Sequence, residues 1–334
     1  MKIGIVGLPG SGKSTVFNSI TQKSAEERDF TKPHLGTIFI PDERLDFIAS
    51  VIKPKKITYS EITFLDMPGY NPAHIQELDA LIYCVGTFQD RDILKDLKDF
   101  EADLILRDLE AIQKRIAKIE KELKRGIADL KNEYAVLLLC KKSLEEEEEL
   151  RFLDLTPQQE KLIAGYQFLS RRPFIVISNI AEEQIGKETS GSMEEYVGKK
   201  GLKLIEFCGK VESEISELPE DERPAFLKES GIKKSAREKF IQVSYEMLDL
   251  IHFYTTKGNE TRSWMIKRST AALDAAGKIH TDIRRGFIRA EVVNFKDFKE
   301  CGSLQAAKEK GFFKVEGKEY VVQDGDIINF RFNV

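Results

Sequence analysis

The chain has 334 residues, a length that favours two or three domains over a single compact core. Hydrophobic residues make up 41% and charged residues 32%, which describes a globular protein with a solvated surface and excludes a chain dominated by disorder. The formal net charge of -4 argues against general coating of nucleic acid, so no DNA partner is expected, although one domain could still carry a local basic patch.

The cysteines and the apolar segments indicate the compartment. Four cysteines, Cys84, Cys140, Cys208 and Cys301, lie far apart and form no CxxC pair, so neither a zinc site nor a disulfide framework is indicated. Residues 1–6 run directly into a strand-like segment without a signal-peptide pattern, and no apolar stretch reaches transmembrane length. We therefore expect a cytoplasmic protein with no membrane partner.

Four short apolar runs predict the core of one mostly parallel sheet. They are residues 3–6, 62–65, 80–85 and 174–178. A glycine-rich turn follows the first run, and residues 14–21 then have a helical pattern. The start of the chain therefore predicts a strand, a loop and a helix whose N-terminus faces that loop.

Between the third and fourth runs the hydrophobic period becomes helical. The apolar residues are spaced alternately by four and three, as in a coiled-coil seam: Ile105, Leu109, Ile112, Ile116, Ile119 and Leu123. A similar stripe continues through residues 127–137, which predicts an antiparallel helical hairpin inserted in the sheet domain. Five successive glutamates at 145–149 are interpreted as a solvated helix face or loop and are assigned no site.

The last part of the chain changes pattern again. Residues 264–266, 287–293 and 320–322 alternate like half-buried strands, which predicts a small mixed sheet in a separate C-terminal domain. The turn dipeptide Asp324-Gly325 lies between residues 320–322 and 327–330 and favours a hairpin there. The chain as a whole is predicted to be an α/β protein.

A complete phosphate-binding motif lies between the first strand and the first helix. Residues 7–14 match GxxxxGK[ST], with Thr15 next, in the strand-to-helix context that a P-loop requires. Its glycines let the backbone wrap around phosphate, Lys13 should reach the β and γ phosphates, Ser14 should ligate Mg²⁺, and Thr15 should support the α phosphate. The predicted phosphate-binding residues are Gly10, Ser11, Gly12, Lys13, Ser14 and Thr15.

A second motif follows the second apolar run. Asp66 opens a DxxG sequence that ends at Gly69. In a nucleotide switch, a carboxylate at this place lies near Mg²⁺ and the glycine amide lies near the γ phosphate. We therefore predict Asp66 as a metal-site residue and Gly69 as a nucleotide-binding residue, with an ordinary turn as the alternative.

Two function classes are compatible with these motifs alone, a small-substrate kinase and a regulatory NTPase with switch loops. Two later segments favour the regulatory NTPase, because they lie where GTPase-type folds hold the base. The residues predicted to hold the base are Asn179, Ile180, Glu182, Cys208, Gly209 and Lys210. A kinase has no need of this pair of segments, and it remains the less favoured alternative.

The sequence at residues 179–182 resembles the NxxE base motif of the YchF subfamily of Obg-like NTPases, which stands in place of the NKxD of ordinary GTPases. Further similar segments are residues 109–112, 155–157, 277–282, 286–292 and 322–334. The resemblance implies a P-loop G domain at 1–95 and 170–248, a helical coiled-coil insertion at 96–169, and a ubiquitin-like (β-grasp) TGS domain at 250–334.

The resemblance also implies a function. It implies an Mg²⁺-dependent regulatory ATPase that associates with the ribosome, is linked to translation or stress, and uses the TGS domain and the hairpin as contact surfaces. A basic patch for ribosomal RNA could be formed by Lys267, Arg268, Arg284, Arg285 and Arg289, or these residues could form a dispersed solvated surface. An adaptor that binds nucleotide with negligible turnover is the alternative.

Several positions depart from the family pattern. Gly10-Ser11 replaces the usual Asn-Val, and both switch segments are short. Thr31 is equated with the family's magnesium-binding threonine, and Tyr70 stands where many GTPases carry a water-orienting glutamine. His74 is the nearby candidate for a catalytic histidine, with a structural role as the alternative. We therefore predict slow turnover.

The base motif predicts a preference for ATP, with GTP possible. Glu182 is one methylene longer than the aspartate that pairs with guanine, and Ile180 replaces the lysine that normally covers the base. Asn179 keeps an amide able to pair with adenine, and Ile180 can pack on its ring. Both changes weaken the selection of guanine.

Overall fold

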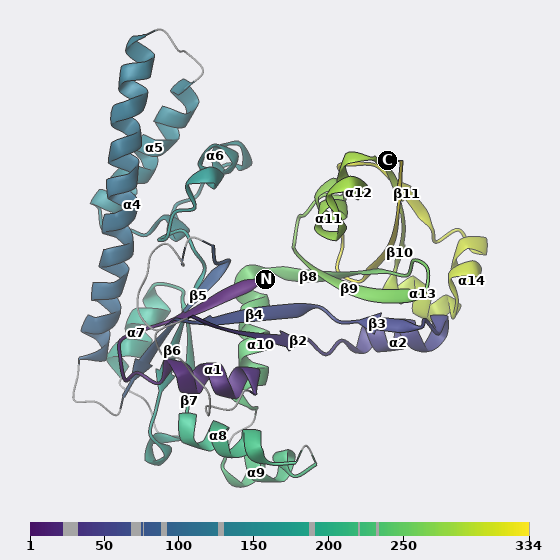
Figure 1. The fold of residues 1–334 in the computed structure, drawn as a ribbon, viewed down its shortest axis with the longest axis horizontal. Coiled ribbons are helices and arrows are strands. Elements are labelled where there is room, and N and C mark those ends of the chain that lie inside the picture. The colour runs from purple at the N-terminus through teal and green to yellow at the C-terminus, as the bar shows by residue number, and fades with distance from the viewer. Residues whose placement is uncertain are drawn as a thin grey trace. The chain divides into compact units, whose positions relative to one another are not determined.

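The structure is a computed structural model, and it describes residues 1–22, 33–67, 75, 77–87, 92–125, 130–186, 191–219, 221–231 and 234–333. The chain forms two compact units (Figure 1). The first unit comprises residues 1–36 and 63–240, and the second comprises residues 37–62 and 241–334. The predicted domain limits placed residues 37–62 in the P-loop domain, whereas the structure groups them with the C-terminal part of the chain.

The first sheet has six strands in the order β2-β4-β1-β5-β6-β7. The strands are β1 (Lys2–Val6), β2 (His34–Phe39), β4 (Glu61–Asp66), β5 (Ala80–Gly86), β6 (Phe174–Asn179) and β7 (Lys203–Phe207). From β4 to β7 the neighbours are parallel, as the apolar runs predicted. Every residue of β5 and β6 is buried. The carboxyl ends of these parallel strands meet at one edge, where open α/β sheets bind their ligands.

Helices cover this sheet. Helices α1 (Lys13–Thr21) and α7 (Gly191–Lys199) pack against its strands, α8 (Gly209–Glu217) packs against α1, and α9 (Arg223–Glu229) packs against α8. Helix α10 (Ala236–Leu248) begins in the first unit and ends in the second. Leu97 and Leu104 of the long helix α4 (Ile93–Lys124), with Met193 and Val197 of α7, pack in one cluster with β-strand side chains such as Tyr83. The sheet, α4 and α7 therefore share one continuous core.

The predicted helical hairpin is present. Helix α4 (Ile93–Lys124) is followed by α5 (Lys131–Glu145), and Figure 1 shows the two side by side. The short helices η2 (Leu150–Phe152), α6 (Pro157–Ile163) and η3 (Ala164–Tyr166) lead back to the sheet. Ile112 and Ile119 of the predicted stripe are fully buried in a cluster with Leu137 and Cys140 of α5. The local spacing of the apolar residues was therefore sufficient to predict which helix faces meet.

One glutamate at the base of the hairpin contradicts the solvated interpretation of residues 145–149. Glu149 is 1% exposed, and its carboxylate lies 2.6 Å from the ammonium of Lys200. The same ammonium lies 3.1 Å from the buried carboxylate of Glu101 on α4, which also accepts a hydrogen bond from Tyr196 of α7. Although burial alone lowers the pKa of Lys200, its bonds to Glu149 and Tyr196 raise it overall. A shared cation therefore allows both carboxylates to be buried.

The second sheet has the order β11-β10-β12-β8-β9-β3. Its strands are β3 (Lys56–Thr58), β8 (Leu250–Thr255), β9 (Glu260–Lys267), β10 (Phe287–Asn294), β11 (Lys314–Glu316) and β12 (Asp326–Phe332). Its helices are α2 (Glu43–Ile52), α11 (Ala272–Ile279), α12 (Thr281–Arg285), α13 (Phe295–Cys301) and α14 (Leu304–Glu309). Ile328 packs in the cluster with the alanines of α11, whereas Ile327 packs in the cluster with Leu45 of α2 and Phe298 of α13. Both faces of the sheet are therefore covered.

The predicted hairpin between residues 320–322 and 327–330 is wrong. Both edges of β12 are taken, one by β10 and the other by β8. Val321 instead makes a single bridge to Ala271, and the carboxylate of Asp326 accepts hydrogen bonds from the Tyr320 hydroxyl and the Gln323 amide. The turn glycine itself was identified correctly, since Gly325 has a left-handed φ of 91°.

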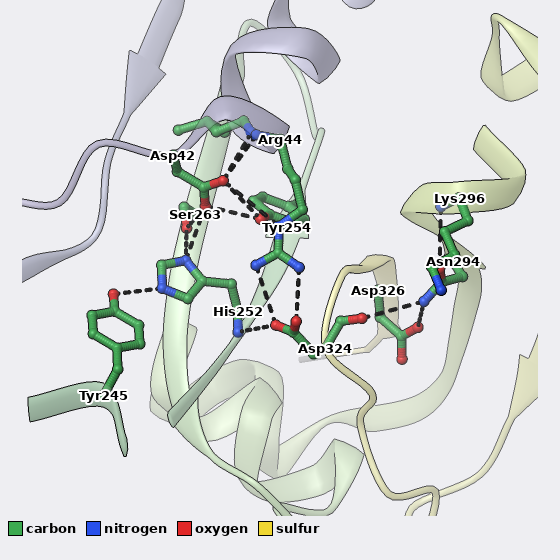
Figure 2. A network of polar contacts seen from close by, with 11 residues as sticks. Asp42, Arg44, Tyr245, His252, Tyr254, Ser263, Asn294, Lys296, Asp324 and Asp326 are labelled. Atoms are coloured by element: carbon green, nitrogen blue, oxygen red, sulfur yellow. Dashed lines mark hydrogen bonds and ion pairs between the residues drawn. The ribbon is translucent and has the colours of Figure 1, made fainter. Parts of the chain in front are cut away.

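A buried polar network explains why residues 37–62 belong to the second unit (Figure 2). The carboxylate of Asp42 caps α2, accepting from the amides of Arg44 and Leu45. It also lies 3.0 Å from Nδ1 of His252 and accepts a 2.8 Å hydrogen bond from the Tyr254 hydroxyl, both on β8. Burial alone raises the pKa of Asp42, but its bonds to His252 and Tyr254 outweigh burial and lower it to about 2.

A second carboxylate completes this network. Asp324 accepts two hydrogen bonds from the guanidinium of Arg44, at 2.8 and 3.2 Å, and one from the backbone amide of His252 at 3.0 Å (Figure 2). The hydroxyl of Tyr245 lies 2.6 Å from Nε2 of His252. The start of α2 is thus fixed to β8 and to the segment that precedes β12.

No helix among the described residues is both long enough and apolar enough to cross a membrane.

Candidate nucleotide-binding site

The glycine-rich loop between β1 and α1 has the backbone that a phosphate loop requires. Gly7, Gly10 and Gly12 have φ angles of 147°, 80° and 91°, which side chains disfavour. A Cβ on Gly7 would lie 2.3 Å from the carbonyl oxygen of Cys84, and one on Gly12 would lie 1.9 Å from the amide nitrogen of Asn179. No side chain caps α1 after Gly12, so its first amides remain oriented toward the loop.

Lys13 is held by the loop itself. Its ammonium donates a 2.9 Å hydrogen bond to the carbonyl of Leu8. Burial lowers the pKa of Lys13, and the charge of the Asp66 carboxylate acts in the opposite direction. Asp66 is 4% exposed and ends β4 opposite Ile5 of β1. Lys13 and Asp66, the two charged residues predicted for the phosphate end, are therefore close enough for their charges to interact.

Asn179 connects the phosphate loop to the base segments. Its side-chain amide donates to the carbonyl of Ser11 at 3.2 Å, and its side-chain oxygen accepts from the amide of Gly209 at 3.1 Å. The thiol of Cys84 also donates to the Ser11 carbonyl at 3.2 Å. From the sequence, Asn179 was predicted only to bind the base. Its second role, holding two loops at a fixed separation, depends on partners about 30 and 170 residues away along the chain.

A single cavity of about 670 Å³ joins the two ends of the site. Its lining consists of Gly10, Gly12, Lys13, Ser14, Thr15, Asn179, Ile180, Ala181, Glu182, Glu183, Cys208, Gly209 and Lys210. Ala181 and Glu183 were not predicted, although they lie within or next to the NxxE motif. The cavity therefore brings together the predicted P-loop and base residues, with the exception of the loop residue Ser11.

The remaining predicted residues lie elsewhere. The loop residue Ser11 is buried, and its hydroxyl has no hydrogen-bond partner within the part of the chain that the structure describes. Asp66 lies at the end of β4 but does not line the cavity. Thr31, Gly69 and His74 lie outside the described residues, as does Tyr70.

The base end of the cavity carries two side chains of opposite charge. The ammonium of Lys210 pairs with the carboxylate of Glu182, and this hydrogen bond raises the pKa of Lys210. Ile180 is 5% exposed because it also packs against Cys208, Val211 and Ile215. A larger cavity of about 860 Å³ lies in the same unit between α1, α8 and α9, but it contains none of the predicted site residues.

Known proteins match the whole chain. Residues 2–142 match the family described as "50S ribosome-binding GTPase", and residues 250–333 match the C-terminal family of YchF GTPases, described as a protein of unknown function (DUF933). The "Ribosome-binding ATPase YchF" of Bacillus subtilis (strain 168) is 36% identical over 361 residues, covering 99% of each chain. The chain belongs to the YchF family.

Other members of the YchF family support the same alignment over full length. The "Ribosome-binding ATPase YchF" of Escherichia coli O157:H7 is 34% identical, covering 100% of this chain and 99% of its own. The solved "Structure of the Schizosaccharomyces pombe YchF GTPase" has a TM-score of 0.82 at 26% identity and covers 99% of this chain and 97% of its own. The predicted resemblance to the YchF family and the α/β fold class are therefore confirmed.

Proposed function

We propose that this chain is a P-loop ATPase/GTPase of the YchF family that binds nucleotide and associates with the ribosome. One observation carries the proposal: a phosphate loop and two base segments line the same cavity, and Asn179 ties them together. The relatives that match at full length are named ribosome-binding ATPases. Nucleotide hydrolysis is the activity that this site and these names support.

The phosphate end binds through backbone amides and one ammonium. The amides at the start of α1 face the loop, and Lys13 can exchange the Leu8 carbonyl for phosphate oxygens. For Mg²⁺, the chain offers the Ser14 hydroxyl on the cavity wall and the buried carboxylate of Asp66, hard oxygen donors of the kind this ion prefers. When bound, the ion would neutralise phosphate charge. Thr31 and Gly69 are proposed to complete this end of the site.

The base end is proposed to prefer ATP while accepting GTP. Guanine offers a ring N–H and an amine to a carboxylate, and adenine offers neither at those positions. The longer Glu182 is poorly placed for the bidentate pairing that guanine requires, and Ile180 is apolar. Asn179, Cys208 and Gly209 are proposed to form the remaining contacts of the base.

Turnover is proposed to be slow. Tyr70 stands where a water-orienting glutamine would increase the rate, and His74 is the candidate catalytic residue. A nucleotide-binding adaptor with negligible turnover is the second candidate, favoured by the same departures from the family pattern.

The ribosome contacts are proposed to lie on the helical insertion, residues 96–169, and on a TGS domain at 250–334, with residues 1–95 and 170–248 as the G domain. The proposed basic patch is partly neutralised. Arg268 pairs with Asp249, Arg284 with Asp274, Arg285 with Asp282, and Arg289 with Glu291. Lys267 makes no ion pair with any described residue.

The test is phosphate release by the purified full-length chain, with ATP or GTP, in the presence and absence of ribosomes. We expect a basal rate well below the typical enzyme turnover of about 10 per second, and a measurable increase with ribosomes. Nucleotide binding without release under either condition would favour the adaptor, and no binding of either nucleotide would refute the proposal.

A further inference from the structure

Glu182 and Lys210 form an ion pair on the wall of the cavity, at the end away from the phosphate loop. Glu182 begins the short helix η4 (Glu182–Gln184), and Lys210 lies in the first turn of α8. Their side chains are 48% and 67% exposed. The carboxylate that the NxxE motif provides is therefore already engaged by a cation of the same protein.

The backbones that carry the two residues are fixed relative to each other. Strands β6 and β7 are neighbours, and the amide of Ile180 donates to the carbonyl of Phe207 at 2.8 Å. Asn179 holds Gly209 at 3.1 Å, one residue before Lys210. On the other side, the Gln184 side chain accepts from the amide of Ala181 at 2.9 Å and from the hydroxyl of Thr87 at 2.8 Å. The pair is thus supported by ordered elements on both sides.

In the absence of nucleotide such an exposed pair contributes little to folding stability. When a base binds in the cavity, the ion pair becomes more important, because the base removes water from the Glu182 carboxylate. Beside guanine, the ring N–H or the amine could give the carboxylate one hydrogen bond, even though the longer Glu182 side chain is poorly placed to accept both. Beside adenine it would face an acceptor, and a desolvated carboxylate without a donor is unfavourable. The ammonium of Lys210 supplies the donor that adenine lacks.

We infer that Lys210 is a specificity-determining residue, which holds the Glu182 carboxylate and so allows adenine to bind while weakening the selection of guanine. This inference rests on the proposed function, since it assumes that a purine occupies this end of the cavity. Lys210 acts through Glu182, so its effect should depend on that carboxylate.

The experiment measures dissociation constants of non-hydrolysable ATP and GTP analogues for the full chain by calorimetry. Lys210→Ala should weaken the ATP analogue and leave the GTP analogue unchanged or tighter, shifting the ratio of the two constants toward GTP by about tenfold. The matched control is Lys199→Ala. Lys199 pairs with Glu195 at 2.6 Å on α7, is 73% exposed and lies outside the cavity, so the ratio should not change.

Repeating the measurement in the Glu182→Gln variant shows whether Lys210 acts through the Glu182 carboxylate or contacts the nucleotide directly. In Glu182→Gln, the further substitution Lys210→Ala should no longer shift the ratio, because the carboxylate is gone. An equal shift in both backgrounds would show that Lys210 acts on the nucleotide directly, and a ratio within twofold of wild type in Lys210→Ala would also overturn the inference. Both outcomes leave the proposed function intact. It fails only if the wild type binds neither analogue.

Discussion

At the scale of single residues, the charge of Lys13 dominates the phosphate end of the site. Lys13→Ala should weaken a non-hydrolysable ATP analogue by about 100-fold or more, because charge-assisted hydrogen bonds to phosphate are lost. Calorimetry measures the affinity. The ammonium donates to the loop carbonyl of Leu8 and is attracted by the buried Asp66 carboxylate, so the thermal unfolding midpoint of the variant is measured beside its affinity. Unchanged affinity would contradict the P-loop assignment.

Asp42 carries the clearest pH dependence in the second unit. Its carboxyl has a pKa of about 2 in the folded chain, against an ordinary value of 3.8. Because the folded value is the lower one, the stabilisation is complete above about pH 4 and is lost as the pH falls toward 2. It amounts to roughly 2 kcal/mol at neutral pH.

The variant Asp42→Asn isolates this contribution. It should lower the free energy of unfolding at pH 7, and the difference from wild type should shrink between pH 4 and pH 2. Trp264 is the single tryptophan and lies on β9, so its fluorescence during urea unfolding reports on this unit. A difference that stays constant down to pH 2 would show that the carboxyl is not held ionised by His252 and Tyr254.

The sequence predicted the residues of the P-loop and the base segments because their functions are encoded in short local patterns. It did not predict that Asn179 would bind Ser11 and Gly209, or that Glu149 would be buried. Both depend on partners brought together only by the sheet and the hairpin. A run of five glutamates gives no local signal that its last member faces a lysine 51 residues away.

At the scale of elements, the cation of Lys200 allows the hairpin to meet α7. Lys200→Met would leave the carboxylates of Glu101 and Glu149 buried without the ammonium that pairs with them. We expect the free energy of unfolding to fall by about 3 kcal/mol, as when one partner of a buried ion pair is removed. Unfolding followed by far-ultraviolet circular dichroism measures this loss, because α4 and α5 contribute much of the helix.

The neighbouring residue supplies the control for this prediction. Lys199→Met removes the last residue of α7, a lysine that pairs with Glu195 in solvent, and stability should stay within about 0.5 kcal/mol of wild type. Equal losses in the two variants would mean that the buried carboxylates take up protons or are solvated when Lys200 is removed.

The elements also show where sequence patterns are informative. The hairpin stripe was predictable because residues three and four apart share a helix face whatever the rest of the chain does. The strands that pair with β12 could not be predicted from the sequence. An alternating strand can pair along either edge, and the turn at Gly325 is compatible with more than one partner. Tertiary packing decides that β10 and β8, and not residues 320–322, pair with the two edges of β12.

At the scale of the whole molecule, ribosome association should depend on cations of the second unit. Lys267→Glu combined with Arg285→Glu should weaken cosedimentation of the full chain with ribosomes by about tenfold at low salt, and by less at high salt. Charge reversal at Lys199, in the first unit, is the control. Association unaffected by the double variant would exclude this surface.

Point substitutions are preferable here to removing the C-terminal domain. Residues 37–62 have their packing partners in residues 241–334, so a truncation near residue 255 would expose Leu45 and Ile48 of α2. A truncated chain could then lose nucleotide or ribosome binding through misfolding alone.

The path of the chain between the two units has a consequence for biosynthesis. Residues 37–62 leave the ribosome early, yet the strands and helices that cover α2 are made only after residue 241. At about 5 to 20 residues per second, the apolar face of α2 stays uncovered for on the order of 10 to 50 s while the rest of the chain is translated. The second unit therefore cannot fold cotranslationally from its first segment onward, and must wait until the residues after 241 have been translated. Its earliest segment is a natural target for chaperones that bind nascent chains.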